Sequence, residues 1–396
     1  MLLTSSFPRW AGDNTTPFVQ QFAQRIARAY GAVHVIAPHF QGAAPAEEPA
    51  DNLSVRRFRY AVPYRLEDIA YGGNAVARVR FTPLYAVKLA LFLLSSLASV
   101  LAARARLINV HWLVPQGLVA MAAKRLTGAK VVVTVHGGDV FSLNNRLFVM
   151  IKKFILKGAD VVVTNSAITR QACEQLYPHR SYEVIPMGVD TEKFQPAPKS
   201  VTLVERYGLG DFTILFVGRL TEDKGLIYLI QALGQLKDSG ADFKALIVGS
   251  GDQESQLKAL TTELGLDAHV VFIGWVPSEE LPDYYNTADV FVGPSVVGSK
   301  GWQEALGLVF IEALATGLPV ISTNTGGIAD VVEDGVTGYL VDQRSSEQIA
   351  RRLQALYEDR APLQELSRHG RATVERRFSW DTVTSAYARV FVELSK

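Results

Sequence analysis

The chain of 396 residues has a single cysteine and lacks several sequence patterns, and each of these features excludes a class of protein. A single cysteine, Cys173, excludes a disulfide framework and a cysteine-based zinc site, and it fits a reducing cytoplasm. The start MLLTSSFPRW lacks the basic region and the long apolar region of a secretory signal peptide, so we expect a cytoplasmic protein. No repeat at a solenoid period and no low-complexity tract is present.

The longest apolar run, residues 89–103 (LALFLLSSLASVLAA), is shorter than the roughly 20 residues that cross a bilayer. Cationic residues surround this run: Arg78, Arg80, Lys88, Arg104 and Arg106. The pattern favours a buried helix of a large α/β domain, and the alternative is a helix that lies partly in a membrane interface. We expect no segment that spans a membrane.

Acidic residues are scarce in the first half of the chain. Residues 1–195 carry 22 Lys and Arg against 12 Asp and Glu, a net charge of +10, whereas residues 196–396 carry a net charge of −9. The basic half therefore predicts an anionic partner such as nucleic acid, a phosphorylated substrate or a membrane surface.

Short β-branched runs alternate with helical patterns in both halves. The runs are residues 33–38, 107–112, 130–136, 160–166, 212–218, 243–249, 269–274, 289–295 and 319–324. Such unbroken apolar strands are typical of parallel sheets covered on both faces. We therefore expect an α/β chain with two Rossmann-like, doubly wound domains, residues 1–195 and 196–378, separated near the linker 188–200. A helix over about 379–396 needs a surface to cover.

Residues that follow the strands are the candidates for a site, because ligands of open parallel sheets bind beyond the carboxyl ends of the strands. Arg219 and Lys224 follow the run 212–218, where the next helix begins. Two cations beside a helix N-terminus favour an anion, and a diphosphate is the obvious match. The spacing is not that of a P-loop, and an ordinary solvated pair is the alternative.

Two further strand ends carry a glycine turn and an aromatic residue. Gly249, Gly251 and Asp252 form a tight turn entering a helix, which is compatible with any close approach of backbone. Trp275 and Val276 follow the next strand. They lie against a flat base, or else Trp275 is an ordinary packed side chain.

The stretch EALGLVFIEALATGLPV (304–320) holds two carboxylates near an apolar core, where they cost free energy unless a polar group pairs with them. A helix is expected to begin near Gly307–Leu308, which leaves Glu304 in the preceding loop and Glu312 inside the helix. Carboxylates suit the hydroxyls of a ribose and a hexose, and free amides at a helix start suit a phosphate. The amides belong to Ala305, Leu306, Gly307, Leu308 and Val309.

In the first half, His136 ends a strand and is followed by two glycines that let a ligand come close. His111 ends the preceding strand, and a lone histidine is more often structural than catalytic. Gly12 and Asp13 lie in the loop after the first strand, which could reach a cleft between two domains.

Several strings together resemble one family. VGRLTEDKG, VGSGD, FIGWVP, DVFVGPS and the run that starts at Glu304 resemble the second domain of family-four retaining glycosyltransferases, and VHGGD, VVVTNS and VIPMGVDTEKF resemble parts of the first domain. The resemblance covers nearly the whole chain. It implies the GT-B fold, in which two Rossmann-like domains face a central cleft and the C-terminal helix packs back on the first domain.

The resemblance also implies a catalytic set and a donor-binding set. In the catalytic set, His136 touches the transferred sugar, Arg219 and Lys224 neutralise the donor diphosphate, and Glu304 lies at the donor-sugar hydroxyls. Glu312 binds the nucleotide ribose. The rest of the donor-binding set is Gly12, Gly249, Gly251, Asp252, Trp275, Val276, Ala305, Leu306, Gly307, Leu308 and Val309.

The implied reaction needs no metal ion and no cofactor other than the nucleotide sugar, and no D-x-D motif is present. The two cations and the helix start oppose the negative charge that develops on the leaving diphosphate. The family retains the anomeric configuration, and same-face attack with the leaving phosphate accepting the proton needs no enzymic nucleophile. We expect transfer of a hexose from a UDP- or GDP-linked donor to a saccharide or lipid-linked acceptor, as in polysaccharide biosynthesis, with no nucleic acid as partner.

The loop around Gly12 departs from the pattern of the family. Gly12 stands where the family often has a Gly-Gly loop, but this chain has AGDN there. The basic first half and the apolar run suggest peripheral contact with an anionic membrane through residues 56–106.

Two rival functions remain: a GT-B epimerase acting on a sugar nucleotide, and a nucleotide-binding regulator without catalysis. The lack of G-x-G-x-x-G after the first strand argues against a dehydrogenase.

Overall fold

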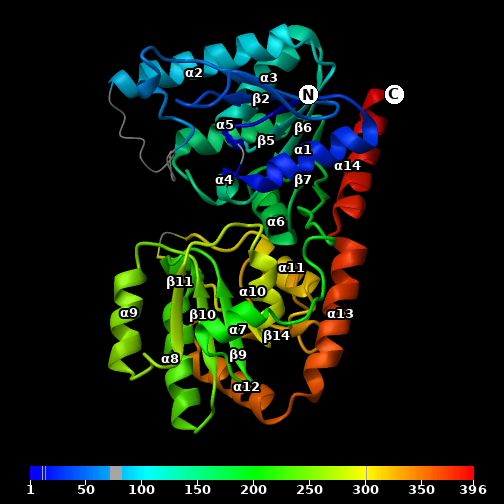
Figure 1. Ribbon diagram of the computed structural model, residues 1–396. Coiled ribbons are helices and arrows are strands. Elements are labelled where there is room, and N and C mark those ends of the chain that lie inside the picture. The colour runs from blue at the N-terminus through cyan, green and yellow to red at the C-terminus, as the bar shows by residue number, and fades with distance from the viewer. Residues whose placement is uncertain (11, 14, 72–82, 300) are drawn as a thin grey trace. The chain divides into compact units, whose positions relative to one another are not determined.

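The computed structural model describes residues 1–10, 12–13, 15–71, 83–299 and 301–396, and Arg78 and Arg80 lie outside the described residues. The chain divides into two compact units, which Figure 1 shows coloured along the chain. Unit 1 comprises Met1–Gly188 and Val383–Lys396, and unit 2 comprises Val189–Thr382. Each unit has its own hydrophobic core around its own sheet.

Unit 1 is built on an eight-stranded sheet with the order β3-β4-β2-β1-β5-β6-β7-β8. Neighbouring strands pair in parallel, except that β3 and β4 are antiparallel. The strands are β1 (Leu2–Leu3), β2 (Val33–Pro38), β3 (Ala46–Ala50), β4 (Leu53–Phe58), β5 (Leu107–His111), β6 (Lys130–Val135), β7 (Val161–Thr164) and β8 (Glu183–Val184). Valines in the centre of β6 are fully buried, because helices cover both faces of a parallel sheet.

The helices of unit 1 include a C-terminal one from the far end of the chain. They are α1 (Pro17–Tyr30), α2 (Pro83–Ala102), α3 (Gln116–Thr127), α4 (Gly138–Phe141), α5 (Arg146–Gly158), α6 (Ala167–Leu176) and most of α14 (Trp380–Ser395), with the short 3₁₀ turn η1 (Tyr64–Leu66). Local sequence sets their starts: the Asn145 side chain caps α5 by accepting a hydrogen bond from the Phe148 amide. α14 is held by Tyr387, whose ring centroid lies 4.7 Å from that of Phe22 on α1.

Unit 2 has a six-stranded parallel sheet with the order β11-β10-β9-β12-β13-β14. The strands are β9 (Thr213–Val217), β10 (Lys244–Val248), β11 (Val270–Gly274), β12 (Val290–Gly293), β13 (Val320–Thr323) and β14 (Gly338–Val341). The helices are α7 (Val201–Tyr207), α8 (Leu226–Asp238), α9 (Glu254–Glu263), α10 (Leu281–Thr287), α11 (Leu308–Ala315), α12 (Ser346–Glu358) and α13 (Ala361–Arg377), with the turns η2 (Glu222–Lys224) and η3 (Ile328–Asp330). In chain order this is the 3-2-1-4-5-6 arrangement of Rossmann folds, whose switch point lies between β9 and β12.

Both doubly wound sheets confirm the expected fold class. The units divide at Gly188 and Thr382, whereas the sequence placed the boundaries at residues 195 and 378. The difference has a local cause: the Val189 amide donates to the Phe378 carbonyl at 2.8 Å, and Val189 bridges to Ser379 in parallel. The linker and the returning segment therefore pair with each other, and Arg371 further ties the linker to unit 2 through the carbonyl oxygens of Thr191 and Phe194.

The apolar run 89–103 lies in a longer helix, α2, which begins at Pro83 and has 20 residues. Among the described residues α2 is the one helix whose length and composition suffice to cross a membrane. The expectation of a buried helix is wrong, because only 17% of its most apolar stretch is buried. A single stripe containing Phe92, Ser96 and Val100 faces the protein.

Candidate functional site

The residues singled out in unit 2 gather around the switch point between β9 and β12. The loop after β9 carries Arg219 and Lys224, and the amide of Val296 in the loop after β12 donates to the Asp223 carbonyl at 2.9 Å. Hydrogen bonding across the two loops thus joins the strand ends where a Rossmann fold binds its ligand. The predicted residues of unit 2 therefore lie at the strand ends where the sequence analysis expected a ligand.

Asp223 organises the two cations of this loop. Its carboxylate lies 3.9 Å from the Arg219 guanidinium and 3.8 Å from the Lys224 ammonium, and it accepts a hydrogen bond from the Thr221 hydroxyl at 2.7 Å. Arg219 is exposed, so its charge is free to turn toward an anion, while Lys224 is half-buried. The sequence did not single out Asp223, because an acidic residue between two cations normally marks a solvated surface.

Lys224 and Glu304 form a direct ion pair and hydrogen bond, although 80 residues separate them. Two residues to which the resemblance gives different roles thus contact each other directly. The Glu304 carbonyl also accepts from the Gly327 amide at 2.8 Å, and a Cβ at Gly326 would lie 1.9 Å from that same oxygen. The lack of a side chain at Gly326 therefore lets the loop after β13 pack on the backbone of Glu304, a role that the sequence did not indicate.

Helix α11 begins at Leu308, so the prediction that Glu304 lies in a loop and Glu312 in a helix is confirmed. Gly307 is the N-cap residue with a φ of 85°, and no side chain caps the helix. Its left-handed backbone suits glycine, and a Cβ there would meet the Phe310 ring at 2.3 Å. Leu306 is buried, while Ala305, Leu308 and Val309 are partly exposed. The uncapped N-terminus keeps amide donors available for an anion.

Glu312 is a partly buried carboxyl on α11. The Tyr285 hydroxyl of α10 donates a hydrogen bond to the Glu312 Oε2 atom at 2.9 Å. Burial raises the pKa of Glu312 to about 7, and the Tyr285 hydrogen bond and the positive charge of Lys193 only partly oppose the rise. Such a carboxyl near half-ionisation can accept hydrogen bonds from ligand hydroxyls. Tyr285 has no signal in the sequence beyond its place in a helical pattern.

The other donor-binding candidates lie at neighbouring strand ends. Gly249 has a φ of 130°, and a Cβ there would lie 1.9 Å from the Gly218 carbonyl oxygen. A Cβ at Gly251 would lie 2.2 Å from the Leu220 carbonyl oxygen, so the turn after β10 packs directly on the turn after β9. Asp252 is exposed. These glycines are required by backbone contact between loops, whatever the ligand.

Trp275 follows β11 and is 61% exposed, so the alternative of a packed tryptophan is wrong. Val276 beside it is buried. An exposed aromatic face next to a strand end is available for a flat ligand group.

In unit 1, His136 lies at the carboxyl end of β6 among aromatic rings and a second histidine. Its ring centroid is 4.9 Å from that of Trp112 and 5.2 Å from that of Phe18. Its Nε2 atom is 2.9 Å from Nδ1 of His111. Burial lowers the pKa of His136 to about 3, so the ring is neutral at physiological pH.

Asp139 holds the His136 loop in place. Its carboxylate accepts from the backbone amides of His136 at 3.1 Å and of Leu113 at 2.8 Å, which joins the loops after β5 and β6. Trp112, which directly follows β5, has a φ of 71°. A bulky residue in the left-handed region marks strain of the kind that often accompanies ligand sites. Trp112 and Asp139 were not among the predicted site residues.

Gly12 is exposed with a φ of 81°, and no other group lies close to the position of its missing Cβ. Its neighbour Asp13 is bound by Arg9 through both oxygens, at 2.7 and 3.1 Å. Burial pushes the pKa of Asp13 upward, but the hydrogen bonds from Arg9 and Thr15 lower it to about 2. Asp13, directly after Gly12, is thus held in an ion pair with Arg9.

Among the residues that the structure describes, no group of three or more His, Cys, Asp or Glu side chains is arranged to hold a metal ion.

Comparison with known proteins identifies the family. The sequence profile of glycosyl transferases group 1 matches residues 205–373, and that of glycosyltransferase family 4 matches residues 16–193. The chain is 30% identical over 402 aligned positions to the GDP-mannose-dependent alpha-(1-6)-phosphatidylinositol monomannoside mannosyltransferase of Mycobacterium tuberculosis, covering 98% of this chain and 96% of the relative. It is also 30% identical to the 2-deoxystreptamine glucosyltransferase of Streptomyces kanamyceticus, covering 88% and 91%.

Among solved structures, sucrose-phosphate synthase from Thermosynechococcus elongatus superimposes with a TM-score of 0.80 at 22% identity, covering 99% of this chain and 98% of that one. This likeness establishes the GT-B fold, which the resemblance implied. The full-length relatives establish the chemistry at the level of the family. Fold, profiles and relatives agree, and the chain belongs to the family-four glycosyltransferases, enzymes of the group 1 type with the GT-B fold.

Proposed function

We propose that the protein moves a hexose from a nucleotide diphosphate sugar to a saccharide or lipid-linked acceptor, with retention of anomeric configuration and without a metal ion. The observation that carries the proposal is the grouping of Arg219, Lys224 and Glu304 in the loops after β9 and β12, directly before α11, with Glu312 inside that helix. Cations and amides suit the diphosphate, and the carboxylates suit the hydroxyls of the two sugars.

The proposed chemical step breaks the bond between the anomeric carbon and the diphosphate oxygen. The acceptor hydroxyl forms the new bond to the same face of that carbon, and its proton passes to the departing phosphate oxygen. Arg219 and Lys224 oppose the charge that develops on the diphosphate, which is where preorganised electrostatics contributes most. Lys224 leaves its pairing with Glu304 to do so, and Glu304 is then free to accept from a sugar hydroxyl.

GDP-mannose is the first donor to test, because the mycobacterial relative is named as dependent on it. A thermal-shift screen against nucleoside diphosphates and their sugars identifies the base, and incubation with that donor plus saccharide and lipid-linked acceptors identifies the product. Product with an unchanged anomeric configuration, formed equally well in excess chelator, supports the proposal. Inversion or loss of activity in chelator contradicts the corresponding part of it.

The same incubation separates the rival functions. An epimerase converts the sugar nucleotide to its epimer in the absence of any acceptor, and this result would overturn the transfer proposal. A nucleotide-binding regulator binds the donor but makes no product with any acceptor. For the transferase, His136→Ala lowers turnover sharply while donor binding to unit 2 persists.

We further propose that α2 is a membrane-docking surface that brings the enzyme to a lipid-linked acceptor. Its outward residues Leu84, Val87, Leu91 and Leu94 recur at heptad spacing, and each is exposed. The opposite face is occupied, since the Ser96 hydroxyl donates to Gln116 of α3 at 3.0 Å. A helix with one face packed on the protein and the other apolar lies on a membrane rather than across it.

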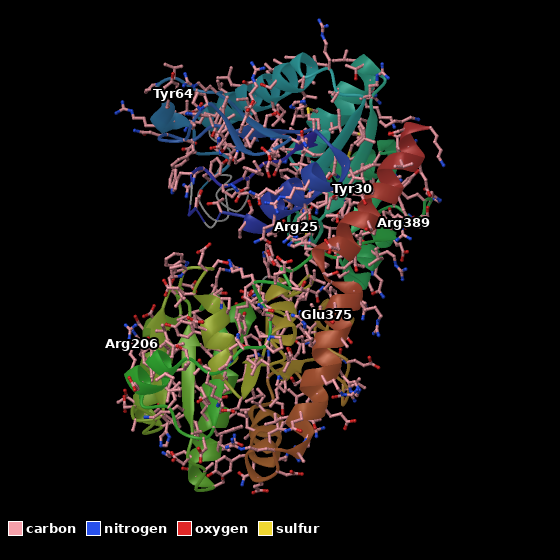
Figure 2. All side chains as sticks on the ribbon, turned by 45° about the vertical axis from the view of Figure 1, so that its right-hand side comes forward. Arg25, Tyr30, Tyr64, Arg206, Glu375 and Arg389 are labelled. Atoms are coloured by element: carbon pink, nitrogen blue, oxygen red, sulfur yellow. The ribbon has the colours of Figure 1, made fainter. Side chains whose placement is uncertain are left out.

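Charge around α2 favours an anionic lipid surface as the occupant. Ser95 of α2 donates to the Arg59 carbonyl at 2.6 Å, which places the exposed Arg59 beside the helix. The Arg59 guanidinium lies 4.4 Å from the ring of Tyr64, an exposed residue labelled in Figure 2. Arg104 and Arg106 are exposed just beyond the C-terminal end of the helix. Each such cation near an anionic membrane adds about 1 kcal/mol of attraction.

Vesicle sedimentation tests the docking surface. Vesicles of phosphatidylglycerol and phosphatidylcholine should bind the wild-type protein at low salt and less of it at high salt. Leu94→Glu should abolish binding, whereas the matched change Leu147→Glu on α5 should not, since the two leucines are 64% and 57% exposed. Equal loss in both variants, or dimerisation through α2 without vesicle binding, contradicts the proposal.

A further inference from the structure

A chain of buried hydrogen bonds leads from the interior of unit 1 to His136. The chain runs from the Asn109 side chain to His111 and from His111 to His136. Asn109 and His111 are fully buried, and His136 at the end of the chain is half-buried. Buried polar groups on a strand are costly, so an arrangement that satisfies each of them in turn restricts where every proton can be.

The orientation of the Asn109 amide is set by its backbone neighbour. One terminal atom of this amide faces the Val132 carbonyl oxygen at 3.3 Å and the Thr134 hydroxyl at 2.9 Å. A carbonyl oxygen can only accept a hydrogen bond, so the atom facing it must be the amide nitrogen. The Asn109 Oδ1 atom therefore faces His111, 3.1 Å from its Nε2 atom.

This orientation fixes both histidines. Because Asn109 Oδ1 can only accept, His111 must carry a proton on Nε2 and donate it. A neutral His111 then has a bare Nδ1 atom, which must accept the 2.9 Å hydrogen bond that joins it to Nε2 of His136. His136 accordingly holds its proton on Nε2, and its Nδ1 atom is left with a lone pair.

We propose that Asn109 and His111 are positioning residues that lock His136 as a neutral imidazole protonated on Nε2, so that its Nδ1 atom accepts a hydrogen bond from a ligand hydroxyl. A lone pair at this atom repels phosphate and carboxylate oxygens and selects a group that carries a proton. Within the proposed transfer reaction, on which the ligand part of this inference rests, that group is a hydroxyl of the transferred sugar or of the acceptor.

The surroundings of the two rings keep them neutral. Burial, together with the charge of the other histidine, holds the pKa of His111 well below its usual range. His136 is packed between Trp112 and Phe18, which offer no counter-charge to an imidazolium. Asp139, the nearest acid on this loop, uses its two oxygens to accept from the backbone amides of Leu113 and His136. His136 therefore donates a hydrogen bond only through Nε2, to His111, and its neutral ring offers Nδ1 as an acceptor.

Nitrogen-15 NMR of the full-length protein with labelled histidine tests the lock directly. Two-bond correlations to the ring protons report which ring nitrogen carries the proton, and the His136→Ala variant assigns the signal among the seven histidines. The wild-type His136 should be protonated on Nε2 alone. A His136 protonated on Nδ1, or one that exchanges between both forms, overturns the inference without any activity measurement.

A matched pair of variants tests the role of His111. In His111→Asn the amide oxygen takes the place of the accepting Nδ1 atom, so His136 should keep its tautomer and turnover should stay near that of the wild type. His111→Leu removes the acceptor, so the tautomer should become mixed and kcat should fall about tenfold, the value of one ordinary hydrogen bond. Affinity for the donor nucleotide should remain unchanged in both, because its proposed site lies in unit 2.

The two proposals fail in distinguishable ways. If His136 is locked as described but no nucleotide sugar is turned over, the transfer proposal fails and the lock stands. If turnover occurs but His111→Asn and His111→Leu behave alike, the lock is refuted. Should His111→Leu not fold, the tautomer of the wild type and of His111→Asn decides the question.

Discussion

Glu312 supports the most quantitative prediction, because its carboxyl titrates near physiological pH. The side chain is partly buried on α11, and burial raises its pKa from an ordinary 4.5 to about 7. Glu312→Gln keeps the size of the side chain and its ability to accept from the Tyr285 hydroxyl, but removes the titration. The variant therefore isolates the free energy of ionising this one group.

The raised pKa predicts a loss of stability as pH rises. The folded state binds the Glu312 proton more tightly than the unfolded state, so stability falls between the unfolded pKa of 4.5 and the folded pKa of about 7. Above pH 7 the full cost corresponds to about 3 kcal/mol. We expect Glu312→Gln to unfold at a higher temperature than the wild type at pH 8, by a margin that shrinks toward zero at pH 4.5.

Binding of the donor should reverse this cost. Ribose hydroxyls donate to the ionised carboxylate, so they favour its charged form and drive the proton off. With a pKa of about 7, Glu312 is half-protonated at pH 7, and a nucleotide sugar should release about half a proton per site. The phosphates of a nucleotide sugar are both esterified and do not titrate in this range, so the ligand adds no protons of its own.

Calorimetry in two buffers of different ionisation enthalpy measures the protons released. The wild type should release close to half a proton at pH 7 and close to none at pH 9, and Glu312→Gln should release none at either pH. Equal release by the two proteins at pH 7 would refute the assignment of the ribose to Glu312. Parallel dependence of their melting temperatures on pH would refute the raised pKa itself.

Three other predictions concern unit 2. Gly249→Ala should lower the free energy of unfolding by more than about 2 kcal/mol. A positive φ alone costs an alanine up to about 2 kcal/mol, and the added Cβ would also clash with the Gly218 carbonyl oxygen. Gly240→Ala, at a φ of 86° in open space, is the control, and equal losses in urea titrations would contradict the proposed loop contact. Lys224→Met should weaken nucleotide-sugar binding by roughly tenfold or more in calorimetry, through loss of a charged hydrogen bond; unchanged affinity would remove it from the diphosphate site. Trp275→Ala should weaken binding of a nucleoside diphosphate but not of pyrophosphate, and equal effects on both would exclude base stacking.

Patterns of short period determined much of the fold from the sequence alone. The unbroken β-branched runs identified nine strands of the two sheets, because burial on both faces leaves few polar positions in such a strand. They missed β3, β4, β8 and β14. The AEEPA segment of the edge strand β3 has little β-propensity, and the LSVRRF segment of β4 contains a serine and two adjacent arginines. Gly307 before an apolar helix was enough to place Glu304 in a loop and Glu312 in α11.

Contacts between segments distant in the chain were decided only by the tertiary structure. The Lys224–Glu304 pair, the packing of Gly326 and Gly327 on the Glu304 carbonyl and the hydrogen bond from Tyr285 to Glu312 each join different loops or helices. The exposure of α2 likewise depends on which stripe packs against α3, since both faces of this helix are apolar in sequence. The sequence alone does not distinguish a structural from a functional histidine at a strand end. His111 has a proposed role only because parallel pairing places Asn109 and His111 of β5 beside β6. Residue type and spacing determine which elements form, and the protonation and pairing of their polar groups follow from which elements the fold brings together.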